Sequence, residues 1–272
     1  MAIATQALAR AFAPSERKRL AGFYGFIAAL HILGWGALLL YVAPRYPAML
    51  GLGGLAYTFG LRHAFDADHI SAIDNTTRKL LQEGKKPLGV GLFFSLGHST
   101  VVFLISLALG LAVHVVVESV QADGGHLKDV GTKVGTGVSG LFLLLIGLLN
   151  LIILLDIHKV YRKMRRGEYD RNELEHQLVA GGFMTRIFGR LFRMITSSWH
   201  MYPIGFLFGL GFDTSSEVAL LAVSAGAAAQ HLPVVAVLVL PVIFASGMSL
   251  MDTTDGAFMA KAYSWAFSNP VS

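Results

Sequence analysis

The sequence predicts an all-α polytopic membrane protein whose six transmembrane helices form two inverted three-helix repeats. Its composition is the first observation behind this prediction. Of the 272 residues, 54% are hydrophobic and only 14% are charged, whereas soluble domains carry about 25% charged residues. A spanning helix needs about 20 mostly apolar residues. Six stretches meet this requirement: Leu20–Ala43, Met49–Ile73, Leu88–Val117, Val134–Ile157, His200–Ala228 and Pro233–Ala257.

The distribution of Lys and Arg orients these six spans. Eighteen of the 22 basic residues fall in the N-terminus, the loop between the second and third spans, the segment between the fourth and fifth spans, and the C-terminus. Three fall on the opposite side and Arg62 lies inside the second span. Because cytoplasmic loops are enriched in Lys and Arg, both termini and the loop 158–199 are predicted to be cytoplasmic. That basic loop is either an amphipathic helix on anionic lipid or a solvated linker.

Two short matches indicate the internal repeat. The tripeptide F-G-L occurs at 59–61 and again at 208–210, and the pattern F-x-x-G-x-S begins at Phe94 and again at Phe244. The offsets are 149 and 150 residues. The chain is therefore predicted to be one transmembrane domain over 1–272, with repeats at about 20–117 and 134–257. Inverted repeats of this kind place their binding site between the halves, near the midplane.

Charged and titratable groups interrupt the second span in the stretch "GLRHAFDADHISAID". Because such groups are costly inside a bilayer, they mark a functional site by default. At 100° per residue, His63, Asp66 and His69 lie within an arc of about 120°, whereas Asp68 falls about 140° from His63. One regular helix therefore cannot aim all four side chains at one small cation.

A break near Gly60, or ligands shared between two facing helices, would resolve this geometry. Broken helices are tolerated at membrane depth where they line a cavity. Imidazole and carboxylate ligands suit nickel, cobalt and zinc better than calcium or potassium. The alternative is a buried ion-pair network, in which Arg62 pairs with Asp66 or Asp68 and only fastens helices together.

Other spans carry polar residues of the same types. His98 lies in "FFSLGHST" of the third span, between two serines. In the fifth span, Asp213 and Glu217 are four residues apart and share a helix face. Asp252 and Asp255 are three residues apart in the sixth span, where Asp255 is either part of the site or an end-capping residue. One hydrophilic cavity where these side chains converge explains them most economically.

Two further residues are candidates for tuning selectivity. His31 is isolated in "AALHILGW" of the first span, and Phe65 lies inside the polar stretch of the second. The alternative for His31 is a hydrogen-bonded histidine in helix packing. No metal site or catalysis through thiols is available, because the chain has no cysteine.

Four motifs resemble the signatures of the bacterial nickel/cobalt transporter family. They are "RHAFDADHISAIDN", "FFSLGHSTVV", "LGFDTSSE" and "GMSLMDTTDG", in the second, third, fifth and sixth spans. The resemblance implies that the H-x4-D-H segment handles the metal, with Asp66 inside it. The metal-handling positions that the resemblance implies correspond in this chain to His63, Asp68, His69, His98, Asp213, Asp252 and, less directly, Asp255.

The resemblance also implies a function. It points to a secondary transporter in the bacterial cytoplasmic membrane that imports Ni²⁺ or Co²⁺ as its substrate, with no cofactor, ATPase partner or nucleic acid. Two rival functions are an exporter with the same motif and a membrane protein that binds metal without transport. An intramembrane metalloenzyme is disfavoured, because the sequence contains no H-E-x-x-H motif. Members of this family usually have eight spans, two more than the six predicted here.

Overall fold

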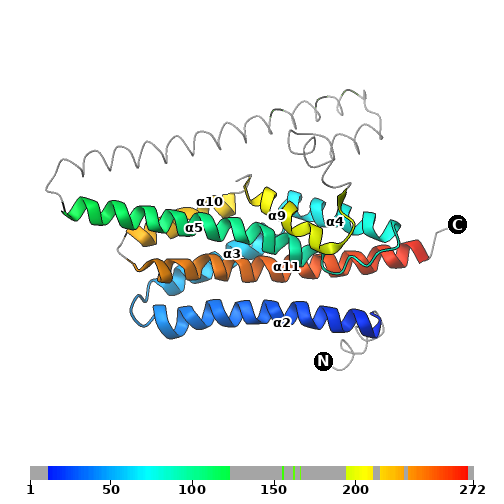
Figure 1. The fold of residues 1–272 in the computed structure, drawn as a ribbon, viewed down its shortest axis with the longest axis horizontal. Coiled ribbons are helices and arrows are strands. Elements are labelled where there is room, and N and C mark those ends of the chain that lie inside the picture. Colours follow the sequence, from blue (N-terminus) through cyan, green and yellow to red (C-terminus); the bar gives the residue numbers. More distant parts are fainter. Residues whose placement is uncertain are drawn as a thin grey trace. The chain divides into compact units, whose positions relative to one another are not determined.

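The computed structural model describes residues 12–122, 194–210, 215–229 and 232–268, together with the isolated positions 155, 162 and 166. Helices account for almost all of these residues, and no strand occurs among them (Figure 1). The elements are α2 (Pro14–Ala37), the π-helix η1 (Leu38–Val42), α3 (Met49–His63), α4 (Ala67–Gln82), α5 (Val90–Ala122), the 3₁₀-helix η2 (Ser198–His200), α9 (Met201–Gly209), α10 (Ser215–Ala229) and α11 (Val234–Ser268).

The chain divides into two compact units. One comprises Met1–Val115 and Thr196–Ser272, and the other comprises Val116–Ile195. Everything described below belongs to the first unit. The prediction of a single transmembrane domain over 1–272 therefore stays a prediction, as does the cytoplasmic loop 158–199.

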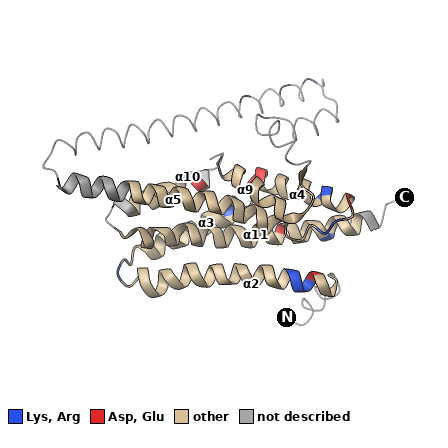
Figure 2. Cartoon of the chain, in the orientation of Figure 1, with Lys and Arg blue, Asp and Glu red and all other residues tan. Residues whose placement is uncertain are grey.

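Three helices of the described chain are long and apolar enough to cross a membrane. They are Pro14–Val42, which joins α2 to η1, Val90–Ala112 in α5, and Val234–Ala266 in α11. They correspond to the first, third and sixth predicted spans. In α2 the charged residues occur only at the N-terminal end (Figure 2). There Pro14 occupies the first helical position, which its fixed φ suits.

The second and fifth predicted spans, Met49–Ile73 and His200–Ala228, are each interrupted. A break in the second span was one of the two alternatives that the sequence left open, whereas the fifth span was predicted to be continuous. α3 ends at His63, a turn follows, and Asp66 precedes α4 with an extended ψ of 146°. The fifth span is divided between α9 and α10. The predicted fourth span, Val134–Ile157, lies outside the described residues except for position 155. The six-helix inverted repeat is thus not confirmed.

Helix α11 packs against α2, α3, α4 and α10, and its buried side chains Leu240, Ile243, Phe244 and Met248 contribute to the main apolar core. Pro241 lies inside this helix without ending it. Proline is tolerated within membrane helices because neighbouring groups satisfy the freed backbone. The packing places α11 beside both halves of the broken second span.

Glycines allow three pairs of helices to approach until their backbones touch. A Cβ added to Gly60 would meet the Phe244 carbonyl of α11, one added to Gly91 would meet the Asp252 carbonyl, and one added to Gly205 would meet the Phe94 carbonyl of α5. Small residues allow this close packing in membranes, where dispersion contacts replace the hydrophobic effect. The glycines therefore fix α3 and α5 against α11, and α9 against α5.

One end of the described bundle gathers the start of α2, the loop before α5 and the last turns of α11. Leu20, Leu88, Ala257 and Ala260 form a buried cluster there. The loop begins where Gly84, with φ of 70°, ends α4, a conformation that glycine adopts without steric cost. These three chain segments therefore lie on one side of the bundle.

Candidate metal centre

Three buried imidazoles from three helices converge beside the break in the second span. His63 is the last residue of α3, His69 lies in the first turn of α4, and His98 lies in α5. All three side chains are fully buried. One ring nitrogen from each lies within 4.8 Å of the others, an arrangement that could hold a metal ion. Among the described residues this is the only such group of histidine and carboxylate ligands.

The break explains how residues six apart in sequence reach the same point. A predicted 120° separation on one helix becomes a direct contact, because α4 starts in a new direction after Asp66. The rings of His63 and His69 stack edge to face with centroids 4.5 Å apart. Backbone hydrogen bonds of 3.0 Å from Phe65 to Arg62 and from Asp66 to His63 hold the turn. A break near Gly60 was one of the two alternatives that the sequence left open, and the break occurs four residues later, whereas Gly60 itself serves helix packing.

The spacing of two ring nitrogens suits a transition-metal ion. The Nε2 atoms of His63 and His98 are 2.9 Å apart. Two nitrogens bound at about 2.1 Å and at right angles are about 3.0 Å apart. Without an ion, this contact is a hydrogen bond in which one imidazole donates Nε2–H and the other accepts. Metal binding through both Nε2 lone pairs would require each ring to carry its proton on Nδ1 instead.

Asp252 of α11 orients His69. Nδ1 of His69 lies 3.1 Å and 3.3 Å from the two carboxylate oxygens of Asp252, and Asp252 is fully buried. Donation from Nδ1–H to the carboxylate fixes the tautomer in which Nε2 is the metal-binding nitrogen. Metal-bound histidines commonly have such a carboxylate partner. The structure therefore places Asp252 behind a candidate ligand, rather than among the three clustered nitrogens.

Two more predicted carboxylates approach the histidines at longer distances. Oδ2 of Asp66 lies 3.7 Å from Nδ1 of His63. Oε2 of Glu217, in the first turn of α10, lies 3.6 Å from Nε2 of His98, and Glu217 is fully buried. With Asp252, these groups could supply the negative charge that a divalent cation requires. Glu217 was a secondary candidate in the sequence and is here among the nearest carboxylates.

The remaining predicted residues lie farther from the histidine cluster or are not among the described residues. Asp68 is partly exposed, and its buried Oδ2 has no hydrogen-bond partner among the described residues. Asp255 is also partly exposed, one turn beyond Asp252 on α11. Asp213 lies outside the described residues. Phe65, on the break, is 61% exposed and does not belong to the cluster.

His31 has its own hydrogen bonds away from the cluster. Its Nδ1 lies 2.8 Å from the Ile27 carbonyl and its Nε2 lies 3.1 Å from the Tyr57 hydroxyl. Both ring nitrogens are thus occupied in helix packing, which is the alternative that the sequence left open. A role in selectivity stays a prediction.

Sequence reasoning missed the aromatic walls of the site. The ring centroids of Phe94 and His69 are 4.8 Å apart, and those of Phe244 and His63 are 5.5 Å apart. Both phenylalanines are fully buried. They were recognised only as matching positions of the repeat, and that match was the available signal. Their rings contribute to the apolar surroundings of the imidazoles.

Arg62 makes a contact with α10 that the sequence did not predict. Its guanidinium donates a hydrogen bond of 2.6 Å to the hydroxyl of Ser216 on α10. This contact joins the break after α3 to the start of α10, beside Glu217. No ion pair between Arg62 and Asp66 or Asp68 occurs among those of the described residues.

Comparison with known proteins identifies the family. Residues 49–272 match the NicO family, described as high-affinity nickel-transport protein. The chain belongs to this family. The match covers every described helix except α2 and η1, so the whole histidine cluster lies inside the family region. The recognised resemblance to nickel/cobalt transporters is confirmed.

Curated members of the family are similar over most of the chain. Nickel transporter NicT of Mycobacterium tuberculosis is 52% identical over 268 residues, which cover 96% of this chain and 72% of that protein. High-affinity nickel-transport protein NixA of Helicobacter pylori is 48% identical, covering 90% and 73%. Cobalt transport protein NhlF of Rhodococcus rhodochrous is 44% identical, covering 96% and 74%. No solved structure matches the chain.

Replacing Asp252 by asparagine should weaken metal binding about 10- to 100-fold, the usual cost of losing the partner of a metal-bound histidine. The amide is nearly the same size but lacks the negative charge that holds the His69 proton on Nδ1. Calorimetric titration of purified protein with Ni²⁺ measures this effect. Asp255→Asn, on the next turn of α11, is the matched control, and an equal loss in both variants would contradict a specific role for Asp252.

Proposed function

We propose that this protein imports Ni²⁺ or Co²⁺ across the bacterial cytoplasmic membrane as a secondary transporter. The observation that carries the proposal is the buried convergence of His63, His69 and His98 from three helices, with ring nitrogens within 4.8 Å of one another. The names of its relatives support both metals, since NicT and NixA are named for nickel and NhlF for cobalt.

In the proposed mechanism the hydrated ion enters from outside and exchanges some of its waters for the three imidazoles. Carboxylates around the rings balance its charge, with Asp252 acting through His69 and Glu217 lying beside His98. Two charges crossing an inside-negative membrane gain about 4.6 kcal/mol per 100 mV. That energy can drive uptake without an ATPase partner, and the metal is cargo rather than a cofactor of an enzyme.

We also propose that the two halves are inverted repeats that move against each other around this site. Matching close contacts support this arrangement. Gly60 of α3 lies against the Phe244 carbonyl. Gly205 of α9, one turn before the Gly209 that matches Gly60 in the repeat, lies against the equivalent Phe94 carbonyl. Gly247 likewise approaches the Tyr57 carbonyl, while Gly97 approaches that of Tyr202. Each interrupted span thus packs on the third helix of the other half, as expected of a broken-helix transporter.

The proposed topology places both termini in the cytoplasm. It is supported by the 18-to-3 distribution of basic residues. The cluster of Leu20, Leu88, Ala257 and Ala260 agrees with it, because it gathers the N-terminal helix, the loop between the second and third spans and the C-terminal helix at one end.

The test is uptake of radiolabelled nickel and cobalt into proteoliposomes with an imposed inside-negative potential. Wild-type protein should accumulate both ions, whereas His63→Ala should lower the initial rate more than about 100-fold, beyond the usual cost of an outer-shell change. His200→Ala removes an imidazole whose contacts among the described residues are with Thr196 and Trp199, and this variant should retain the wild-type rate.

Three outcomes would contradict different parts of the proposal. Flux only out of the vesicles would make the protein an exporter. Stoichiometric binding without flux would make it a metal-binding protein that does not transport. Uptake that is unchanged in His63→Ala would remove the histidine cluster from the transport path.

A further inference from the structure

A basic cavity lies beside the first turns of α2, away from the histidine cluster. Its volume is about 450 Å³. Three cationic side chains line it: Arg19 of α2, and Lys85 and Lys86 of the loop before α5. The hydroxyl residues of 196–198 and the aromatic rings of Phe93 and Trp199 complete its lining. Nothing in the transport mechanism uses these residues.

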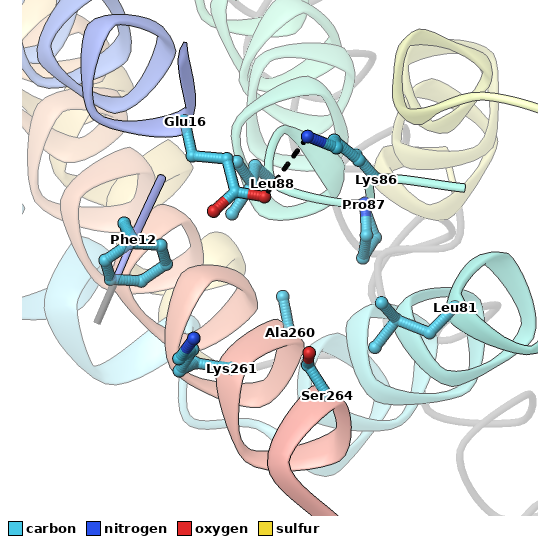
Figure 3. Close-up of a pocket in the computed structure, with 9 residues that line it drawn as sticks. All are labelled: Phe12, Glu16, Leu81, Lys86, Pro87, Leu88, Ala260, Lys261 and Ser264. Atoms are coloured by element: carbon cyan, nitrogen blue, oxygen red, sulfur yellow. Dashed lines mark ion pairs between the residues drawn. The ribbon is translucent and has the colours of Figure 1, made fainter. Parts of the chain in front are cut away.

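The charge of this cavity is positive and only partly compensated. Among the described residues, no carboxylate lines it. Lys85 pairs with Glu83 at 2.6 Å, and Lys86 pairs with Glu16 at 3.5 Å. Figure 3 shows Lys86 reaching from its loop toward Glu16. Exposed ion pairs of this kind contribute little free energy, so an anionic ligand can compete for these lysines.

Hydroxyl groups offer hydrogen bonds on the same lining. Oγ of Ser197 is buried and has no hydrogen-bond partner among the described residues. Among the described residues, the hydroxyls of Ser198 and Thr196 make long contacts of 3.4 Å, to the Lys86 carbonyl and to Nδ1 of His200. Because buried polar groups almost always have a partner, the Ser197 hydroxyl points to a ligand that accepts a hydrogen bond.

The cavity lies near the ends of two candidate membrane spans. Arg19 is near the start of the candidate span Pro14–Val42, and Lys85 and Lys86 directly precede the span that starts at Val90. Trp199 is 59% exposed. Tryptophan is enriched at the level of lipid headgroups, and basic pockets between membrane helices bind anionic headgroups. The positive-inside rule accounts for the charges, but it does not account for a hollow with a buried, unpartnered hydroxyl.

We propose that this cavity binds the headgroup of an anionic phospholipid. Arg19 and the two lysines contact the phosphate, Ser197 donates a hydrogen bond to a phosphate oxygen, and Phe93 and Trp199 contact the glycerol and upper acyl chains. The apolar rings favour a lipid phosphodiester over free phosphate, which has no apolar part. The bound lipid would link the loop before α5 to the segment before α9.

Native mass spectrometry of the delipidated full-length protein, titrated with phosphatidylglycerol or phosphatidylcholine, tests this proposal. One phosphatidylglycerol should bind at least tenfold more tightly than phosphatidylcholine. Arg19→Gln and Ser197→Ala should each weaken phosphatidylglycerol binding about tenfold, as expected for a hydrogen bond to a charged group. Arg17→Gln changes an exposed arginine on the same helix that does not line the cavity and should leave binding unchanged.

Tryptophan fluorescence locates the bound lipid independently. The chain has three tryptophans, so replacing Trp35 and Trp265 by phenylalanine leaves Trp199 as the only one. Phosphatidylglycerol brominated near the top of its acyl chains should quench this fluorescence, and Arg19→Gln should reduce the quenching at equal lipid concentration.

Several results would overturn the proposal. An equal loss of binding in Arg17→Gln would indicate diffuse attraction to a basic surface. Equal affinity for the two lipids would remove the role of charge. If millimolar inorganic phosphate occupies the cavity and excludes phosphatidylglycerol, the ligand is free phosphate. Nickel uptake by Arg19→Gln in the proteoliposome assay reports whether the variant is folded, so failure of the lipid site is distinguishable from failure of transport.

Discussion

Replacing His98 by alanine should reduce nickel uptake more than about 100-fold. His98 is fully buried, and its Nε2 lies 2.9 Å from that of His63. The substitution leaves two imidazoles and an apolar gap beside Glu217. Losing a direct ligand should cost more than the 10- to 100-fold penalty of losing an outer-shell partner. Initial rates in proteoliposomes at saturating and subsaturating nickel measure the loss.

His98→Gln keeps a polar side chain of similar reach and separates ligation from packing. If His98 binds the ion, His98→Gln should also lose uptake while its thermal unfolding temperature stays close to that of the wild type. A glutamine variant with the wild-type rate would show that His98 only fills space between α5 and its neighbours.

Replacing Gly60 by alanine should destabilise the protein and disrupt the metal centre together. The added methyl carbon would overlap the Phe244 carbonyl, and it would lie 3.1 Å from the Cα atom of Phe244. Because both contacts are backbone, α3 and α11 must separate, at a cost of about 1–3 kcal/mol or more. Phe244 contacts His63, so the movement also displaces a candidate ligand. Thermal unfolding in detergent and nickel uptake should both fall.

Gly54→Ala on the same helix is the matched control for Gly60→Ala. An added Cβ at Gly54 meets nothing within 4 Å. Alanine is favoured over glycine in a helix by about 1 kcal/mol, so this variant should be as stable as the wild type or more stable. If both variants unfold at the same lower temperature, the close approach at Gly60 is not what holds α3 against α11.

Residue types and spacing were sufficient to predict much of the candidate site. The H-x4-D-H pattern identified His63 and His69. Because one regular helix could not aim this group of side chains at a single ion, the sequence left open either a break in the helix or ligands shared between facing helices. The break occurs at 64–66 rather than near Gly60, with Asp66 in an extended conformation directly before the new helix. Gly60 lacks the side chain that would block α11. A glycine in a predicted span can mark a break in the helix or a close contact with a neighbouring helix, and the sequence alone does not distinguish these two roles.

Contacts between distant helices could not be predicted. His69 and Asp252 are 183 residues apart, and Arg62 and Ser216 are 154 apart. Their pairing depends on which faces of α4, α10 and α11 meet, and glycine contacts set those faces. Hydropathy predicted continuous second and fifth spans, because the few polar residues at a break barely change the average over 20 residues. The separate roles of Asp252 and Glu217 likewise became visible only in three dimensions.

A crystal structure of the nickel-loaded protein, with an anomalous difference map at the nickel absorption edge, tests the central claim most directly. We expect one strong peak within about 2.1 Å of ring nitrogens from His63, His69 and His98, and no such peak in the His98→Ala protein prepared identically. A nickel peak elsewhere in the bundle, or none in a protein that transports nickel, would contradict the assignment of these three imidazoles as the metal centre.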